Sequence, residues 1–280
     1  MSTLEGGVAE LYSAYDVLDR IKTGLAEMGY SSAPVPLDVL KPVDEFHIGG
    51  AQATDYLLGQ LDLDSGTRVL DIGSGIGGAA RMIASRFGCP VTGIDLTPAF
   101  VDTARELTEL CGMGANPSFQ VASATALPFD AASFDLATML HVGMNIPDKE
   151  AVFAEARRVL RADGVFAVYD VMRIGDGELT FPVPWADTQK ISALAGPDVY
   201  KALAGEAGFT LVSEESRQAI ALEFFEKIRA QAAESAPPPL GLHNLMGPSI
   251  GAKMSNMIAG IRADVIAPVL MIFQASANRG

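Results

Sequence analysis

Cysteine and histidine are scarce in this sequence. Only Cys89 and Cys111 occur among 280 residues, which is too few for a disulfide framework. The three histidines lie far apart, and neither a His-x-x-x-His pair nor a paired-cysteine motif is present, so we expect no metal site. The low cysteine content predicts a cytoplasmic protein, because thiols stay reduced in that compartment.

Positive charge is also scarce. The chain has 20 basic and 34 acidic residues, for a formal net charge of -14. A surface with this excess of negative charge repels phosphate backbones and anionic lipid headgroups. We therefore expect a small-molecule partner, and neither nucleic acid nor a membrane.

Long hydrophobic runs are missing as well. The most apolar stretch, at 265–273, has about half the length that spans a bilayer, and it is predicted to be a buried strand. The N-terminus carries acidic residues and lacks the basic region and apolar run of a signal peptide. These features predict no membrane span and no export.

From residue 67 onward, short β-branched runs alternate with helical segments, which is typical of βαβ units. The pattern predicts an α/β fold with a Rossmann-like, seven-stranded, mostly parallel sheet and helices on both faces. The predicted strands are 68–72, 91–95, 118–122, 134–140, 165–170, 209–214 and 265–273, with helices at 77–87, 98–112, 149–160 and 198–207.

Segments outside this alternation predict a helical cap. Apolar residues at helical spacing predict a first helix at 4–28, which a proline-rich turn at 31–42 ends. We therefore divide the chain into an N-terminal helical cap, 1–62, and an α/β domain, 63–280. Two long insertions, at about 171–197 and 220–262, are interpreted as parts of a cap over the carboxyl end of the sheet. The alternative interpretation is that both insertions are family-specific surface segments that do not form a cap.

A glycine-rich turn follows the first strand of the α/β domain, in VLDIGSGIGG at 69–78. Gly73 and Gly75 permit positive φ and a close approach of a nucleoside to the backbone. Asp71 precedes the first glycine by two residues, where a carboxylate favours a cationic ligand over a diphosphate. Asp95 ends the next strand, where it can accept hydrogen bonds from ribose hydroxyls.

The same glycines satisfy the G-x-G-x-x-G pattern of dinucleotide-binding proteins, which is weak evidence alone. No Tyr-x-x-x-Lys pair of a short-chain hydride-transfer enzyme occurs. A nicotinamide-dependent oxidoreductase remains a less favoured alternative, and so does a protein that binds a cofactor without catalysis.

Four motifs in order resemble those of class I S-adenosylmethionine-dependent methyltransferases: VLDIGSGIGG, VTGIDLTP, VASATALPFDAASFDLATMLHVGMNIPDK and EARRVLRADGVFAVYD. The resemblance covers residues 45–215 and implies that 63–280 is a methyltransferase domain. HIGGAQAT at 47–54, FPVPWA at 181–186 and GEAGFTLVSEES at 205–216 are most similar to small-molecule enzymes. That group includes sarcosine/dimethylglycine N-methyltransferases and natural-product sugar O-methyltransferases.

The resemblance implies S-adenosylmethionine as cofactor and assigns its contacts. Gly73 and Gly75 are expected under the methionine portion, Asp95 at the ribose and Leu96 on the adenine. Ser123 stands where many relatives carry an acidic residue for the adenine amino group, and a hydroxyl can still accept one hydrogen bond. The predicted cofactor-binding residues are Asp71, Gly73, Ser74, Gly75, Asp95, Leu96, Ser123, Ala124 and Leu140.

Candidate acceptor-site residues come from three segments. His141 directly follows the fourth strand, where doubly wound sheets bind ligands, so it is the candidate catalytic base; capping a strand is the alternative. His47, Met144 and Trp185 are candidate substrate contacts. Trp185 could instead anchor the cap to the core rather than contact the substrate. Likewise, His47 could be an ordinary loop residue and Met144 an ordinary packing residue.

The expected reaction is methyl transfer from S-adenosylmethionine to a small molecule. The resemblance to the sarcosine/dimethylglycine group favours an amine acceptor, and O- or C-methylation of a natural product or sugar is the alternative. The apolar first helix could cover the active site of its own chain or that of a second copy, so a homodimer is also possible.

Overall fold

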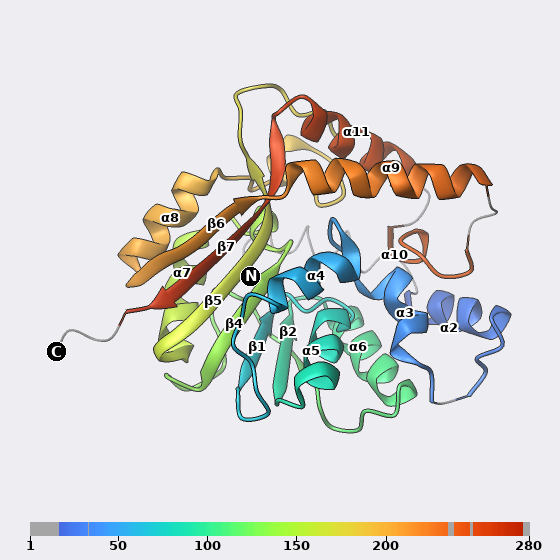
Figure 1. Cartoon of the computed structure of the whole chain (residues 1–280), viewed down its shortest axis with the longest axis horizontal. Coiled ribbons are helices and arrows are strands. Elements are labelled where there is room, and N and C mark those ends of the chain that lie inside the picture. Colours follow the sequence, from blue (N-terminus) through green and yellow to red (C-terminus); the bar gives the residue numbers. More distant parts are fainter. Residues whose placement is uncertain (1–16, 33, 235–237, 247–248, 277–280) are drawn as a thin grey trace.

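A computed structural model describes residues 17–32, 34–234, 238–246 and 249–276, and its centre is a seven-stranded sheet in the order β3-β2-β1-β4-β5-β7-β6 (Figure 1). β1 to β5 run parallel, whereas β7 pairs antiparallel with both β5 and β6. The predicted fold class is therefore confirmed. The strands are β1 Val69–Ile72, β2 Val91–Asp95, β3 Ser118–Val121, β4 Phe134–Leu140, β5 Leu160–Arg173, β6 Phe209–Ser216 and β7 Ile266–Ala275.

Helices cover both faces of the sheet, because successive strand residues point to opposite sides. Leu70 and Ile72 of β1 pack with α7 and α8, whereas Val69 packs with α4, α5 and α6. Each fully buried aliphatic side chain contributes about 1.5–3 kcal/mol to folding. These helices span α4 Gly50–Leu58, α5 Gly78–Phe87, α6 Pro98–Leu110, α7 Lys149–Val159 and α8 Pro197–Glu206.

The prediction of a proline-rich turn at 31–42 is wrong for its second half. A helix, α3, spans Leu37–Asp44, begins after Pro36 and contains Pro42. Leu40 and Val43 are fully buried in a cluster shared with α2 (Val17–Glu27). This packing outweighs the backbone hydrogen bond that the proline cannot donate. Of the predicted helix at 4–28, residues 4–16 lie outside the described residues.

A buried ion pair attaches α3 to α5. Arg81, with no solvent exposure, donates from Nη2 to Asp44 Oδ1 at 2.5 Å. Its Nη1 donates to the carbonyl of Ala104 and to Thr108 Oγ1, both in α6. Breaking such a buried pair costs several kcal/mol, so Arg81 fixes the end of α3 and the loop that follows it.

β5 is longer than the predicted strand at 165–170. It begins at Leu160, which pairs with Phe134, and it ends at Arg173, which pairs with Ile266. The predicted insertion at 171–197 therefore begins inside a strand. The missed residues hydrogen-bond to distant partners, which the local pattern does not reveal.

The two predicted insertions meet in one apolar cluster. Trp185 packs in it with residues of α9 (Gln218–Glu234) and α11 (Ile250–Arg262), and with Met144 after β4. Figure 1 shows α9 and α11 lying together beyond one end of the central strands. The division of the chain into a cap and a domain stays a prediction. No helix among the described residues is long and apolar enough to cross a membrane.

Candidate functional site

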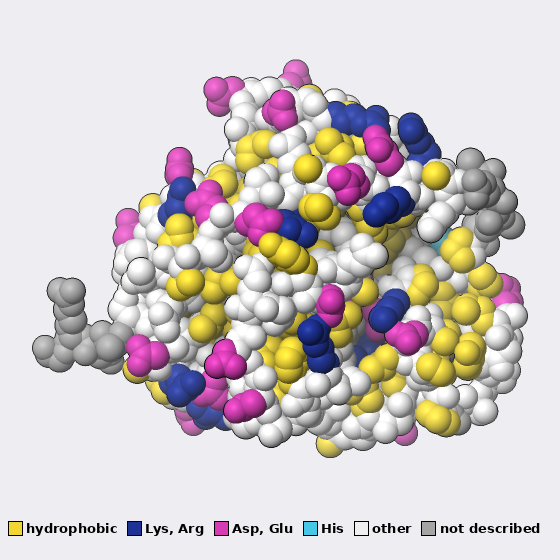
Figure 2. All heavy atoms as spheres, in the orientation of Figure 1, with side chains coloured by type: hydrophobic (Ala, Val, Ile, Leu, Met, Phe, Trp, Pro, Cys, Tyr) yellow, Lys and Arg dark blue, Asp and Glu magenta, His cyan; other side chains and the backbone are white. Residues whose placement is uncertain are grey.

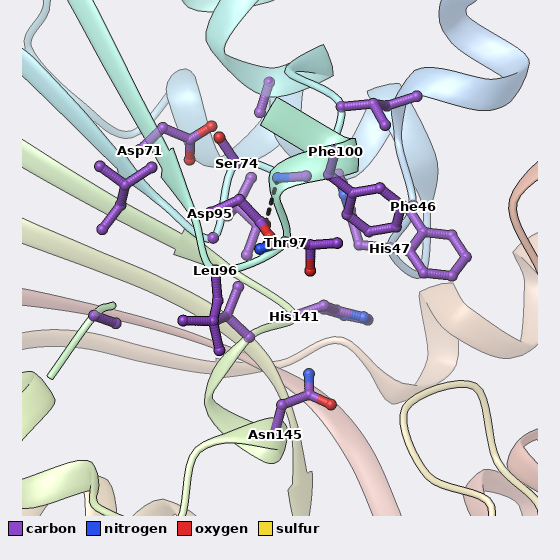
Figure 3. Close-up of a pocket in the computed structure, with 18 of the residues that line it drawn as sticks. Phe46, His47, Asp71, Ser74, Asp95, Leu96, Thr97, Phe100, His141 and Asn145 are labelled. Atoms are coloured by element: carbon purple, nitrogen blue, oxygen red, sulfur yellow. Dashed lines mark hydrogen bonds between the residues drawn. The ribbon is translucent and has the colours of Figure 1, made fainter. Parts of the chain in front are cut away.

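A cleft lies at the carboxyl ends of β1, β2 and β4 (Figure 3). All nine residues predicted to bind the cofactor line it, together with His47 and His141. Figure 3 shows Asp71 and Ser74 on one side of the cleft, Phe46 and Phe100 on the other, and His141 and Asn145 beyond Leu96. The structure therefore brings these predicted residues together, although their roles stay predictions.

Asp95 holds two walls of the cleft together. Its Oδ2 accepts the backbone N–H of Gly75 at 3.0 Å, and its Oδ1 accepts the N–H of Thr97 at 2.8 Å. Burial raises the pKa of this carboxyl, and the backbone donors oppose that rise. Each carboxylate oxygen can accept a further hydrogen bond from a ligand.

The glycine turn leaves open space where side chains would stand. Gly75 has φ +54°, and a Cβ added there would meet no protein atom within 4 Å. At Gly73, with φ +73°, an added Cβ would lie 2.3 Å from Cγ2 of Val142. Gly75 thus opens the floor of the cleft, whereas Gly73 permits the close packing of the turn against the segment after β4.

Asp71 is a buried acid with one unpartnered oxygen. Its Oδ1 accepts a hydrogen bond from Thr138 Oγ1 at 2.8 Å, but Oδ2 has no partner among the described residues, and neither has Ser74 Oγ. Burial raises the pKa of Asp71 to about 7. A ligand with a positively charged amino group would satisfy this oxygen and favour the ionised carboxylate.

Ser123 lies at another side of the same cleft, in the loop after β3. Its Oγ accepts the backbone N–H of Thr125 at 3.2 Å and lies 2.8 Å from Thr125 Oγ1. These bonds fold the loop into a turn that keeps the serine in the cleft lining.

A second, small chamber adjoins the cleft. The two cavities share Phe46, His47 and His141 in their walls, and Met144 and Trp185 line the chamber. The His47 and His141 rings are 5.8 Å apart between centroids. The four predicted acceptor-site residues therefore surround one space next to the cleft.

Burial disfavours protonation of both chamber histidines. Burial lowers the pKa of His47 to about 4, and burial together with His47 lowers the pKa of His141 well below its usual value. His141 has a positive φ of 56°, and its Nε2 is buried without a hydrogen-bond partner among the described residues. In the tautomer that carries its proton on Nδ1, Nε2 can accept a hydrogen bond from an acceptor hydroxyl.

A polar network fixes His47. Its Nε2 lies 3.1 Å from the carbonyl of Gly50 and 3.0 Å from Thr54 Oγ1. Thr54 donates its hydroxyl proton to Glu45 at 2.8 Å, so Nε2 carries the proton and donates to both oxygens. His47 is thereby held in one tautomer beside His141.

Asp170 lies beside the segment that carries Met144, one of the residues that line the chamber. It is fully buried, it accepts the Tyr200 hydroxyl at 2.5 Å, and its pKa is raised to about 7 by burial. The backbone of Met144 also hydrogen-bonds to this carboxyl. A Cβ at Gly143 would lie 2.3 Å from Asp170 Oδ2, so only glycine fits before Met144. No local sequence pattern indicates this arrangement.

Replacing Tyr200 by phenylalanine should lower the free energy of unfolding by about 2 kcal/mol, because it leaves a buried carboxyl oxygen of Asp170 unsatisfied. Urea unfolding of both proteins measures this difference. Tyr56→Phe is the matched control, because Tyr56 is 41% exposed and its hydroxyl donates to Glu215 near solvent. An equal loss in both variants would contradict the role of the buried pair.

Several lining residues were missed by the sequence analysis. Phe46 and Phe100 form one wall of the cleft, and Asn145 forms another with its buried Oδ1 unpartnered among the described residues. Leu245 reaches the cleft from α10 (His243–Met246). Asn145 follows β4 within the quoted motif and could have been considered, whereas nothing local connects Leu245 with this site.

Comparisons with known proteins agree with this geometry. A family model described as a methyltransferase domain matches residues 70–168. Methyltransferase GfsG from Streptomyces halstedii is 31% identical over 212 residues, which are 73% of this chain and 74% of that protein. An O-methyltransferase from Pyrenophora dematioidea is 25% identical over 255 residues, which are 89% and 86% of the two chains.

A solved structure shares the fold. Phosphoethanolamine N-methyltransferase 2 from Haemonchus contortus, in complex with S-adenosyl-L-methionine, superposes with a TM-score of 0.70. The match covers 94% of this chain and 60% of that one, at 21% identity. At this identity the likeness supports the fold alone.

Proposed function

Because the chain belongs to the class I S-adenosylmethionine-dependent methyltransferases, we propose that its cofactor lies along the glycine turn, with the sulfur end facing the chamber. Membership in this family sets aside the nicotinamide alternative. The described residues fit the cofactor: Asp71 Oδ2 is an unpartnered acceptor, and Gly75 leaves its side open. The cofactor supplies a methyl carbon bonded to a positively charged sulfur.

Different residues of the cleft bind different parts of the cofactor. Asp95 accepts the ribose hydroxyls, because each of its oxygens keeps a lone pair after bonding to Gly75 or Thr97. Asp71 and Ser74 bind the methionine end, and Leu96 and Ala124 contact the adenine. Ser123 offers one hydroxyl oxygen to the adenine edge. No acidic residue is needed there if apolar contacts hold the ring.

We propose further that the acceptor presents a hydroxyl group to His141. The observation that carries this proposal is the buried, unpartnered Nε2 of His141 at the junction of cleft and chamber. The cofactor would supply its methyl carbon to the acceptor oxygen, and the electron pair of the broken carbon–sulfur bond would stay on sulfur. His141 Nε2 takes the hydroxyl proton, so the methyl ether leaves uncharged.

An amine acceptor, the sequence-based preference, is the second candidate. Trp185 and Phe225 line the chamber, and the face of an aromatic ring attracts a cationic nitrogen. However, the chamber lining contains no carboxylate, and both of its histidines are kept neutral by burial. This environment favours a neutral acceptor over an ammonium ion.

Paired acceptors distinguish the two candidates. The protein is incubated with S-adenosylmethionine and with apolar phenols or alcohols, each matched to the amine of the same skeleton. We expect S-adenosylhomocysteine and a methyl ether from the hydroxyl compounds. Turnover of the amines alone would contradict a hydroxyl acceptor and support the second candidate.

Cofactor affinity should rise with pH up to about 7, because Asp71 has to lose its proton before it pairs with the cofactor ammonium. Below that pH the affinity should fall by up to about tenfold per pH unit, since one proton is released per cofactor bound. Calorimetric titrations at pH 5.5, 6.5 and 7.5 measure this slope. Asp71→Asn, which cannot ionise, should remove it, and an unchanged slope in that variant would assign the proton to another group.

We also propose a cytoplasmic location. Both cysteines are free, Cys89 buried and Cys111 partly buried, in keeping with a reducing compartment. Fractionation of the source cells tests this proposal.

A further inference from the structure

A large groove lies between the cap helices and the N-terminal helices. Its volume is about 1560 Å³, and its walls come from α9, α11, α3 and the start of α4. Figure 2 shows that this face of the molecule is hollowed beneath α9. Phe224, Ile228, Ile250, Met254 and Ile258 give the groove an apolar wall. Nothing in the proposed methyl-transfer step uses this space.

The groove adjoins the chamber that holds His141. Phe224, Phe225, Leu242 and Met254 line both cavities, and His47 lines the groove, the chamber and the cofactor cleft. The chamber itself has a volume of only about 60 Å³, enough for a reacting group but not for a whole acceptor of ordinary size. For an acceptor larger than the chamber, the groove is the adjoining space that can hold the rest of the molecule.

We propose that the methyl acceptor carries an elongated apolar body that occupies this groove while its reacting hydroxyl lies at His141. This inference rests on the proposed function, because it takes the chamber as the place of methyl transfer. It assigns the acceptor to amphiphilic molecules with a long apolar portion, rather than to compact polar ones such as short amino acids.

The charged residues of the groove further restrict the class of methyl acceptor. Lys41, Arg229 and Arg262 line it and are all exposed, and Lys41 pairs with Asp38. Glu45 also lines it, but it is 5% exposed and bonded to Thr54, and burial raises its pKa. The rim therefore favours an apolar body whose free end is anionic.

Binding of cis-parinaric acid, a fluorescent polyunsaturated fatty acid, tests the groove on the full chain loaded with S-adenosylhomocysteine. We expect fluorescence enhancement with one probe per chain. Met254→Glu should weaken binding more than tenfold by placing a charge in the apolar wall, and Met254→Trp should weaken it by filling the groove without adding charge. Val212→Glu is the matched control, because Val212 is 61% exposed on β6, away from the groove lining.

Calorimetry with S-adenosylmethionine on the same variants separates the two proposals. Normal cofactor affinity without probe binding by the unmodified chain overturns the groove inference and leaves the proposed function standing. If the unmodified chain does not bind the cofactor, both the groove inference and the proposed function are overturned. Sedimentation reports whether a second copy covers the groove, and a dimer that Met254→Glu dissociates, with no probe binding, also overturns the inference.

Discussion

Replacing His141 by asparagine should lower kcat by about 100-fold or more while leaving cofactor affinity within about threefold, because a general base contributes about 10²–10⁴ to rate. Asparagine tolerates the positive φ of 56° at this position, so the backbone should keep its conformation. The measurement is the steady-state rate of S-adenosylhomocysteine formation with a hydroxyl acceptor, alongside a calorimetric titration of the cofactor.

A second variant at the same position keeps the test sharp. His141→Gly also suits the left-handed backbone and opens a space the size of an imidazole beside His47. Imidazole added to the assay should restore part of the lost rate if the missing group is a base. A kcat within threefold of the unmodified protein in both variants would mean that His141 only ends a strand.

Replacing Asp95 by alanine should weaken S-adenosylmethionine binding by about 100- to 1000-fold. The carboxylate accepts the N–H groups of Gly75 and Thr97. In the proposed binding mode it also accepts the ribose hydroxyls. Hydrogen bonds to a charged group contribute about 1.5–3 kcal/mol each, so the loss of two or more accounts for this factor. Calorimetry of the cofactor measures it directly.

Asp102→Ala is the matched control for the Asp95 variant. Asp102 lies one turn into α6, and its side chain is 70% exposed and pairs with Arg105 three residues on. Its removal takes away the same charge a short distance from the site and should change cofactor affinity little. Equal weakening in both variants would indicate a general loss of negative charge rather than a specific contact at Asp95.

The sheet and the grouping of the predicted cofactor-binding residues around one cleft could be predicted because their signals are local. β2 and β4 coincide with the predicted strands. A buried strand of a parallel sheet is a short apolar run with turn-forming residues at both ends, which a local pattern reveals. The turn at Gly73 and Gly75 is equally local. Glycines at positive φ after a strand indicate a tight turn, in which Gly75 leaves open space and Gly73 packs against Val142.

What could not be predicted depends on contacts between distant segments. α3 forms although Pro42 lies inside it, because Leu40 and Val43 find buried partners and Arg81 attaches its end to α5. The support of Met144 by Asp170 likewise joins segments far apart in sequence. Burial, rather than residue type, is what keeps His47 and His141 neutral, and burial is set only by the folded chain.

A crystal structure of the full chain with S-adenosylhomocysteine is the most direct test of the site. The ribose hydroxyls should lie within hydrogen-bond distance of Asp95, the amino group should contact Asp71 Oδ2, and the sulfur should face the chamber at His141. A cofactor whose sulfur points away from His141, or whose ribose leaves Asp95 without contact, would contradict both the arrangement of the cleft and the place of methyl transfer.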